Sequence, residues 1–143
     1  MKSELIGENR ISIVLDEDQE VAVLRASIFE FTREQIMLKN PVRNETWAVL
    51  QGLYRKTAPL RVEVEGKSLP YYKAVVERFI ERTPDRLLEI ATHPRMEPTE
   101  LLLRQTLGET AIHFVAQLDE ILIDSTVAEF SNILDEISPG DFV

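Results

Sequence analysis

The most extended helical pattern in the chain lies at residues 99–124, where apolar residues recur at helical spacing with no internal proline. At 3.6 residues per turn, these apolar residues fall into two groups. One face carries Leu103, Leu107, Ala111, Phe114, Leu118, Ile121 and Leu122, and roughly opposite lie Leu101, Ile112, Ala116 and Ile123. A surface helix needs only one apolar stripe, so this pattern predicts a central helix packed between neighbours. Gly108 indicates either a close contact with a neighbouring helix or a kink in this helix, and we favour the close contact.

The same periodicity predicts five further helices, which gives about six in all. They begin near Asp18, Asn44, Pro70, Pro84 and Thr126. Thr126 and Glu129 have the spacing of a capping box, which predicts a new helix start at that point. The first of these helices has a rival over residues 21–31, namely a β-hairpin that turns at residues 17–19. The helix is favoured, and the hairpin stays open.

Two short strands are predicted, at residues 11–15 and 60–65. The first is rich in β-branched residues, and the second alternates apolar and charged residues, as in a strand with one wet face. A lone pair of strands needs helix cover to be stable, so we expect the two to pair beneath the helices. Residues 1–9 are expected to form a loose lead-in. The predicted fold is mainly α (α+β), a single domain at 1–143 with helices around the central one and a minor two-stranded element.

The composition of the chain limits its chemistry. Its 143 residues are 44% hydrophobic and 29% charged, which suits one soluble globular domain. There is no cysteine, so disulfides, thiolate catalysis and cysteine-ligated metal sites are excluded. No stretch approaches the ~18 consecutive apolar residues of a membrane span, and the first residues lead into no secretory signal. We therefore expect a soluble, cytoplasmic protein.

The net charge of −9 is concentrated in the C-terminal part of the chain. Residues 1–104 carry 16 Lys and Arg and 17 Asp and Glu, whereas residues 105–143 carry eight acidic residues and no Lys or Arg. A negative surface repels nucleic-acid phosphates and anionic lipids, so direct binding to nucleic acid or membrane is not expected. The acidity either keeps the protein soluble or faces a basic partner protein, and the pattern leaves both open.

Glu109, His113 and Glu120 form the one grouping that resembles a metal site. They share the polar arc of the predicted central helix, where a carboxylate and a histidine four residues apart could supply ligands. Helical metal sites draw ligands from more than one helix, so a further group such as His93 would be needed. A solvated contact between histidine and carboxylate is the commoner use of such a pair. No Ser-His-Asp arrangement, calcium loop or Gly-rich phosphate loop is recognisable, so we predict no catalytic residue and no cofactor.

The residues most suited to contact a partner are Tyr71, Glu129, Asp135 and Glu136. Tyr71 lies beside the core-facing Tyr72 and is expected to be exposed near arginines, an arrangement that suits an interaction site. The three acidic residues belong to the acidic C-terminal segment. Trp47, in contrast, is expected in the core.

These observations favour a non-enzymatic protein-interaction module, that is, a regulator, adaptor or assembly chaperone with an acidic C-terminal face. The alternative is a small metal-dependent enzyme or metal-binding protein that uses Glu109, His113 and Glu120. An enzyme is less favoured because no catalytic pattern is recognisable. Homo-oligomerisation stays open, since a second subunit could cover the second apolar side of the central helix.

Overall fold

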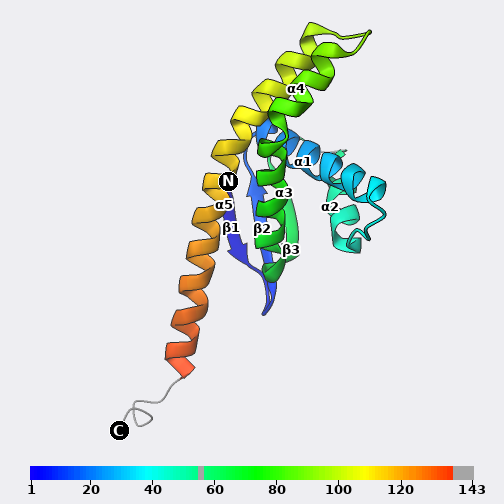
Figure 1. Ribbon diagram of the computed structural model, residues 1–143. Helices are drawn as coiled ribbons and strands as arrows, with labels where there is room; N and C mark the ends of the chain where they lie inside the picture. Colours follow the sequence, from blue (N-terminus) through cyan, green and yellow to red (C-terminus); the bar gives the residue numbers. More distant parts are fainter. Residues whose placement is uncertain (55–56, 137–143) are drawn as a thin grey trace.

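The computed structural model describes residues 1–54 and 57–136, and in the last helix it describes side chains as far as Asp124. Five α-helices and a three-stranded sheet make up this part of the chain (Figure 1). The strands are β1 (Lys2–Leu5), β2 (Arg10–Leu15) and β3 (Leu60–Glu65). The helices are α1 (Asp18–Met37), α2 (Asn44–Tyr54), α3 (Leu69–Glu81), α4 (Thr83–Thr92) and α5 (Pro98–Glu136), and a 3-10 turn, η1 (Gly66–Ser68), links β3 to α3. The mainly helical class is confirmed, with five helices in place of six.

The sheet has the order β1-β2-β3, and both pairings are antiparallel. The strands predicted at 11–15 and 60–65 are confirmed as neighbours, with Ile13 opposite Val62. The predicted number of strands is wrong, because β1 lies within the segment expected to be a loose lead-in. All four residues of β1 are exposed, so no apolar alternation signals this strand. It is held by backbone pairing with β2, which a side-chain pattern does not reveal.

Residues 21–31 are helical and lie within α1, so the hairpin alternative is wrong. The carboxylate of Glu20 fixes the start of this helix, because it accepts hydrogen bonds from the backbone N–H groups of Asp16 at 2.9 Å and Glu17 at 3.1 Å. The adjacent apolar residues that made the pattern ambiguous, including Val23 and Leu24, are buried. They are buried together because α1 packs against both β2 and α5, so that adjacent sides of the helix are covered.

The last helix is continuous from Pro98 to Glu136, although the sequence predicted two helices with a new start at Thr126. A capping box starts a helix only where the preceding chain leaves helical geometry. No proline or glycine interrupts residues 109–136, so the helix continues through that point. At 1.5 Å per residue, the 39 residues of α5 span about 58 Å.

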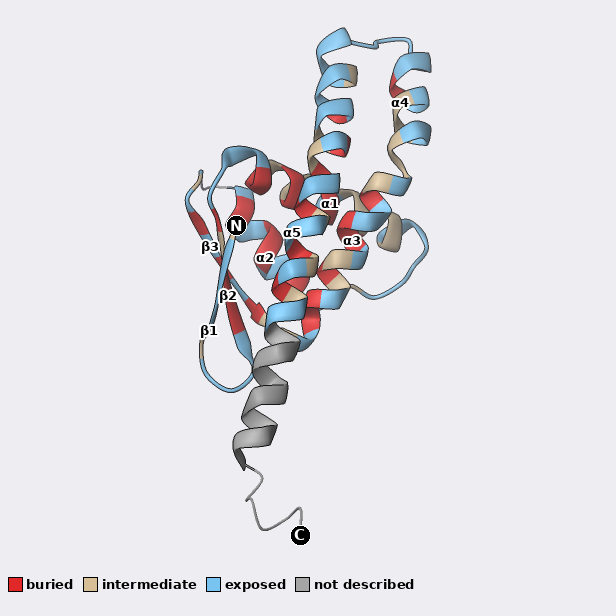
Figure 2. Cartoon of the chain, turned by 90° about the vertical axis from the view of Figure 1, so that its left-hand side faces the viewer, coloured by how far each residue is buried: buried red, intermediate tan, exposed pale blue. Residues whose placement is uncertain are grey.

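One apolar core lies between the sheet and the helices, which cover the same face of the sheet (Figure 2). Its largest fully buried side chains include Phe79 of α3, Leu53 of α2 and Ile28 of α1. Trp47 does not join them, and the expectation that it is a core residue is wrong. Its side chain is 43% exposed, because the buried side of α2 is taken by other residues, such as Thr46.

α4 and the first turns of α5 form a helical arm that extends beyond the body of the molecule (Figures 1 and 2). The two helices of the arm pack against each other. The arm leaves several large apolar side chains exposed, namely Leu88, Met96, Leu102 and Leu103. Within the described part of the chain, no helix is long and apolar enough to cross a membrane.

Candidate interaction surface

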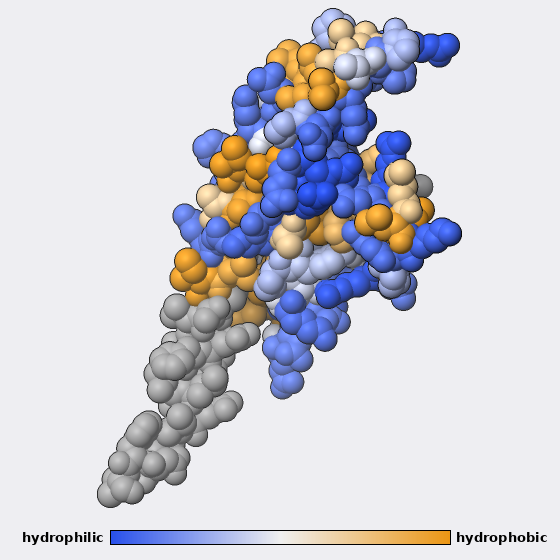
Figure 3. Space-filling view, viewed as in Figure 1, coloured by the Kyte–Doolittle hydropathy of each residue, from blue (hydrophilic) through white to orange (hydrophobic). Residues whose placement is uncertain are grey.

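The outer side of α5 carries a row of apolar residues, the α5 row, made up of Leu101, Ile112, Ala116 and Ile123. Ile112 is 57% exposed and Ile123 is 62% exposed, whereas Leu101 is half-buried. Residues 101, 112 and 123 are eleven apart, close to three helical turns, so they stay on one side of the helix over about 33 Å. The expected burial of this helix on two sides is therefore wrong. Figure 3 shows apolar patches along α5.

The opposite stripe of α5 is buried as predicted over its central part. It packs against α1 and α3, and its buried members are Ala111, Phe114, Leu118 and Ile121. Leu103 was predicted on this stripe but is 60% exposed. Leu103 lies in the first turns of α5, where the buried side of the helix carries Arg104 instead.

An acidic arc lies beside the α5 row and contains Glu109, Glu120 and Asp124. All three side chains are exposed, and none forms an ion pair with another described residue. Asp119 differs, because Lys73 Nζ lies 2.5 Å from its carboxylate, a contact that raises the pKa of Lys73. The exposed charge of this arc is therefore negative and unneutralised within the described part of the chain.

The metal-binding alternative gains no further ligand from the fold. Glu109, His113 and Glu120 do share one exposed arc, but Glu120 lies eleven residues from Glu109, about 16 Å along the helix axis. His93 lies between α4 and α5, where its Nδ1 accepts a hydrogen bond from the Arg95 N–H at 3.0 Å. Among the described residues, no group of three His, Asp or Glu side chains is placed to hold a metal ion. The alternative stays a prediction.

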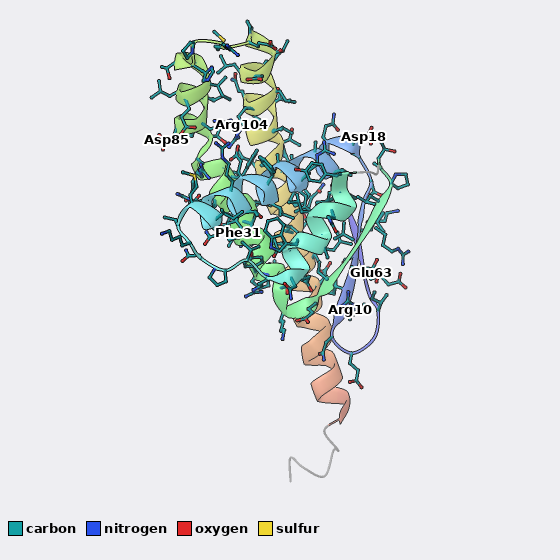
Figure 4. All side chains as sticks on the ribbon, turned by 90° about the vertical axis from the view of Figure 1, so that its right-hand side faces the viewer. Arg10, Asp18, Phe31, Glu63, Asp85 and Arg104 are labelled. Carbon is teal, nitrogen blue, oxygen red and sulfur yellow. The ribbon has the colours of Figure 1, made fainter. Side chains whose placement is uncertain are left out.

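A buried arginine, Arg104, anchors the arm to the body (Figure 4), and this role was not predicted from the sequence. It is only 6% exposed. Its guanidinium donates to both carboxylate oxygens of Glu30 on α1, at 2.9 and 3.1 Å. It also donates to Thr83 Oγ1 at 2.8 Å and to the Phe79 carbonyl oxygen at 3.0 Å. Burial lowers the pKa of Arg104, although the group stays charged. The available signal was a basic residue within an apolar run.

Gly108 allows α4 to approach α5 beside this arginine. The predicted close contact is confirmed, because a methyl group at Gly108 would lie 2.8 Å from Thr83 Oγ1 and 2.9 Å from Thr83 Cγ2. Atoms this close cannot coexist without a shift of the neighbour. Thr83 is also held in place, since its hydroxyl donates to the Phe79 carbonyl oxygen at 2.9 Å. The start of α4 is therefore fixed against α5 by both shape and hydrogen bonding.

Tyr71 is half-buried and belongs to an aromatic cluster, so it is less exposed than expected. Its ring centroid lies 5.6 Å from that of Phe31 and 5.3 Å from that of Tyr72, both in edge-on geometry. The Arg43 guanidinium lies 4.3 Å from its ring centroid, and the Thr46 hydroxyl donates to its hydroxyl oxygen at 3.3 Å. These contacts stabilise the ring from several sides. A role of Tyr71 in binding stays a prediction.

The other predicted contact residues, Glu129, Asp135 and Glu136, lie in the last part of α5. The backbone is helical there, but the side chains lie outside the described residues. Their role in binding also stays a prediction.

Comparison with known proteins adds no family to this description. No protein-family model, curated protein or solved structure matches the chain.

Proposed function

We propose that the protein is a non-enzymatic interaction module, such as a regulator, adaptor or assembly chaperone, that binds a basic amphipathic helix of a partner protein along α5. The observation that carries this proposal is the α5 row, in which Ile112 and Ile123 are exposed on a helix whose other side is packed. Single exposed apolar residues are common, but several along one side of a helix are typical of an interaction face.

The charge beside the α5 row supports a basic partner. Glu109, Glu120 and Asp124 lie next to the apolar residues without an ion pair among the described residues. A partner helix that carries apolar residues at helical spacing, with Lys or Arg beside them, would bury the row and neutralise the arc. A helix is favoured over a loop as the partner element, because two helices pack along their ridges and the row offers about 33 Å of contact.

The test compares the partners retained by two double variants of the full chain. Ile112→Gln/Ile123→Gln removes the row, and the control, Ile36→Gln/Leu88→Gln, changes two similarly exposed apolar residues on α1 and α4. Pull-downs from native lysate should recover a protein that the row variant loses and the control retains, with cross-links that map to a basic helix of that protein. Equal recovery by both variants refutes the proposal. A stable homodimer that only the row variant dissociates also refutes it.

The acidic C-terminal segment provides a separate test. Truncation of residues 126–143, or replacement of Asp135 and Glu136 by Lys, should weaken recovery of the same partner because it removes or reverses negative charge. The weakening should grow at low salt, where charge interactions are least screened. Unchanged recovery would show that the C-terminal charge does not contribute to binding, and the proposed site would then consist of the α5 row alone.

A further inference from the structure

β3 is an edge strand of the sheet, and only one of its sides is paired with another strand. Just beyond the ladder, the Gly66 N–H donates to the Asn9 carbonyl oxygen at 2.8 Å. Hydrogen-bonded and non-hydrogen-bonded pairs alternate along an antiparallel ladder, so the backbone groups of Arg61, Glu63 and Glu65 point away from β2. These three residues present N–H and C=O groups at the outer edge of the sheet.

Glu45 of α2 closes one end of this edge, because its Oε2 accepts a hydrogen bond from the Glu65 N–H at 3.2 Å. No described residue accepts a hydrogen bond from the backbone N–H groups of Arg61 and Glu63. An unpaired edge of this kind is a template for another strand unless a side chain or a neighbouring element blocks it. Two successive outward-facing residues of β3 therefore have room for four backbone hydrogen bonds.

α2 turns this edge into a groove. Figure 4 shows α2 running alongside β3, and Figure 1 places it on the side away from β2. On the helix side the groove is lined by Asn44, Glu45, Ala48, Val49 and Gly52. A methyl group added to Gly52 would meet no atom within 4 Å. The groove thus has the backbone edge of β3 as one wall and α2 as the other, with open space beside Gly52.

The position of α2 favours one added strand over a second copy of the chain. A strand placed beside β3 would lie under α2, as β3 itself lies under the other helices (Figures 1 and 4). A second copy paired edge to edge would carry its own α2 and α3 into the space already filled by these helices. Only a segment that is extended and unaccompanied by its own helix layer fits the groove.

The side chains of β3 set the sequence that such a segment needs. Arg61 and Glu63 are exposed on the outer face, whereas Leu60, Val62 and Val64 face the core. Residues directly opposite each other in an antiparallel pair share a face, so an acidic residue opposite Arg61 and a basic residue opposite Glu63 are favourable. The residues between them would face α2 and the core, where apolar side chains are favourable.

We propose that the groove between β3 and α2 binds an extended segment of a partner protein as a fourth, antiparallel strand. Read from its N-terminus, the segment has the pattern apolar, basic, apolar, acidic, apolar. Antiparallel pairing is the arrangement already present in the sheet and is slightly more stable per residue than parallel pairing. Affinity comes from the backbone bonds of Arg61 and Glu63, and specificity from the alternating side chains. This site is separate from the α5 row and does not rest on it.

A nuclear magnetic resonance titration of the full chain with the synthetic peptide TVKVEVT tests the proposal. The amide signals of Ala48, Gly52, Arg61 and Glu63 should shift saturably, while those of the α5 row stay unchanged. Gly52→Leu should weaken binding about tenfold or more, because its side chain fills the groove and blocks the added strand. Gly52→Ala is the matched control, since it also improves helix propensity but leaves most of the groove open. Absence of saturable shifts, shifts only elsewhere, or unchanged affinity in Gly52→Leu overturns the proposal.

A charge exchange tests the register without altering the groove. The peptide TVEVKVT places like charges opposite Arg61 and Glu63 and should bind the wild-type chain about fivefold more weakly than TVKVEVT, since each exposed cross-strand pair contributes modestly. The double variant Arg61→Glu/Glu63→Arg should reverse this preference. Equal binding of the two peptides by both proteins would overturn the antiparallel register.

Discussion

Replacing Glu30 by Gln should destabilise the fold more than replacing Arg104 by Met, although the two side chains share one ion pair. Arg104 is 6% exposed, and Glu30 lies nearer the surface, with 16% of its side chain exposed. Glu30→Gln therefore leaves a buried guanidinium without its counter-ion, whereas Arg104→Met leaves a carboxylate near the surface. A buried cation without its counter-ion costs much more free energy than a carboxylate that can still meet water.

The magnitudes follow from the contacts that remain. After Glu30→Gln, the guanidinium keeps only neutral acceptors, the Thr83 hydroxyl and the Phe79 carbonyl oxygen. Breaking a buried pair costs about 3–5 kcal/mol, and the amide oxygen recovers part of this, so we expect a loss of about 3 kcal/mol. After Arg104→Met, Glu30 keeps Arg86, whose Nε lies 4.0 Å away, and the Met side chain should pack against the Phe79 ring that the guanidinium covers in the wild type. We expect a loss of about 1 kcal/mol.

Urea denaturation followed by circular dichroism measures both changes and the double variant. A domain of this size has a free energy of unfolding of about 5–15 kcal/mol, so each single variant should still fold. The double variant should cost less than the sum of the single changes, because the second change removes the stranded charge. Equal losses for Glu30→Gln and Arg104→Met, or a larger loss for Arg104→Met, would refute the reasoning that Arg104 is a buried cation held by Glu30.

Three further outcomes are expected. Gly108→Ala should lower the free energy of unfolding by about 1–3 kcal/mol in urea titrations because of its close contact with α4, whereas Gly52→Ala, in open space, should raise it by up to about 1 kcal/mol. Burial, with a contribution from the nearby Glu45 charge, raises the pKa of Tyr72. The folded state therefore favours the neutral phenol, so thermal midpoints should fall as pH rises above about 10, and less steeply in Tyr72→Phe. Elemental analysis should find no stoichiometric metal, and a bound ion lost in His113→Ala would instead support the metal-binding alternative.

The sequence predicted those helices and strands whose own residues show a clear helical or strand periodicity. β3 alternates apolar and charged residues, and three of its side chains face the core accordingly. The start of α1 was ambiguous because Val21, Val23 and Leu24 are buried together. Neither the period of a helix with one buried side nor the alternation of a strand describes these positions. β1 was missed because its pairing depends on backbone groups rather than on side chains.

The candidate surfaces were less predictable, because exposure depends on neighbours that a sequence does not place. The pattern showed that Ile112 and Ile123 lie apart from the buried stripe of α5, but not that the chain leaves them uncovered. The apolar run around Arg104 signals an unusual position for a basic residue, but its ion-pair partner lies 74 residues away and no local pattern identifies it. The groove beside β3 likewise requires α2 and β3 to lie together.

Variants at two residues of α5 can distinguish its exposed face from its core face by their effect on stability. Phe114 is 3% exposed, so Phe114→Ala should cost about 3–5 kcal/mol of unfolding free energy through lost burial and the cavity that remains. Ile112 is already mostly in water, and Gln is at least as good a helix former as Ile. We therefore expect Ile112→Gln to change the unfolding free energy by no more than about 0.5 kcal/mol.

The same urea titrations decide whether the α5 row is exposed in the free protein. If Ile112→Gln cost more than about 1.5 kcal/mol, the side chain would have to be covered, and the described part of this chain offers nothing that covers it. A second copy acting as the cover would make the unfolding midpoint rise with protein concentration, because association stabilises only the folded state. A small cost that is independent of concentration leaves the row available to a different protein, as the proposal for α5 requires.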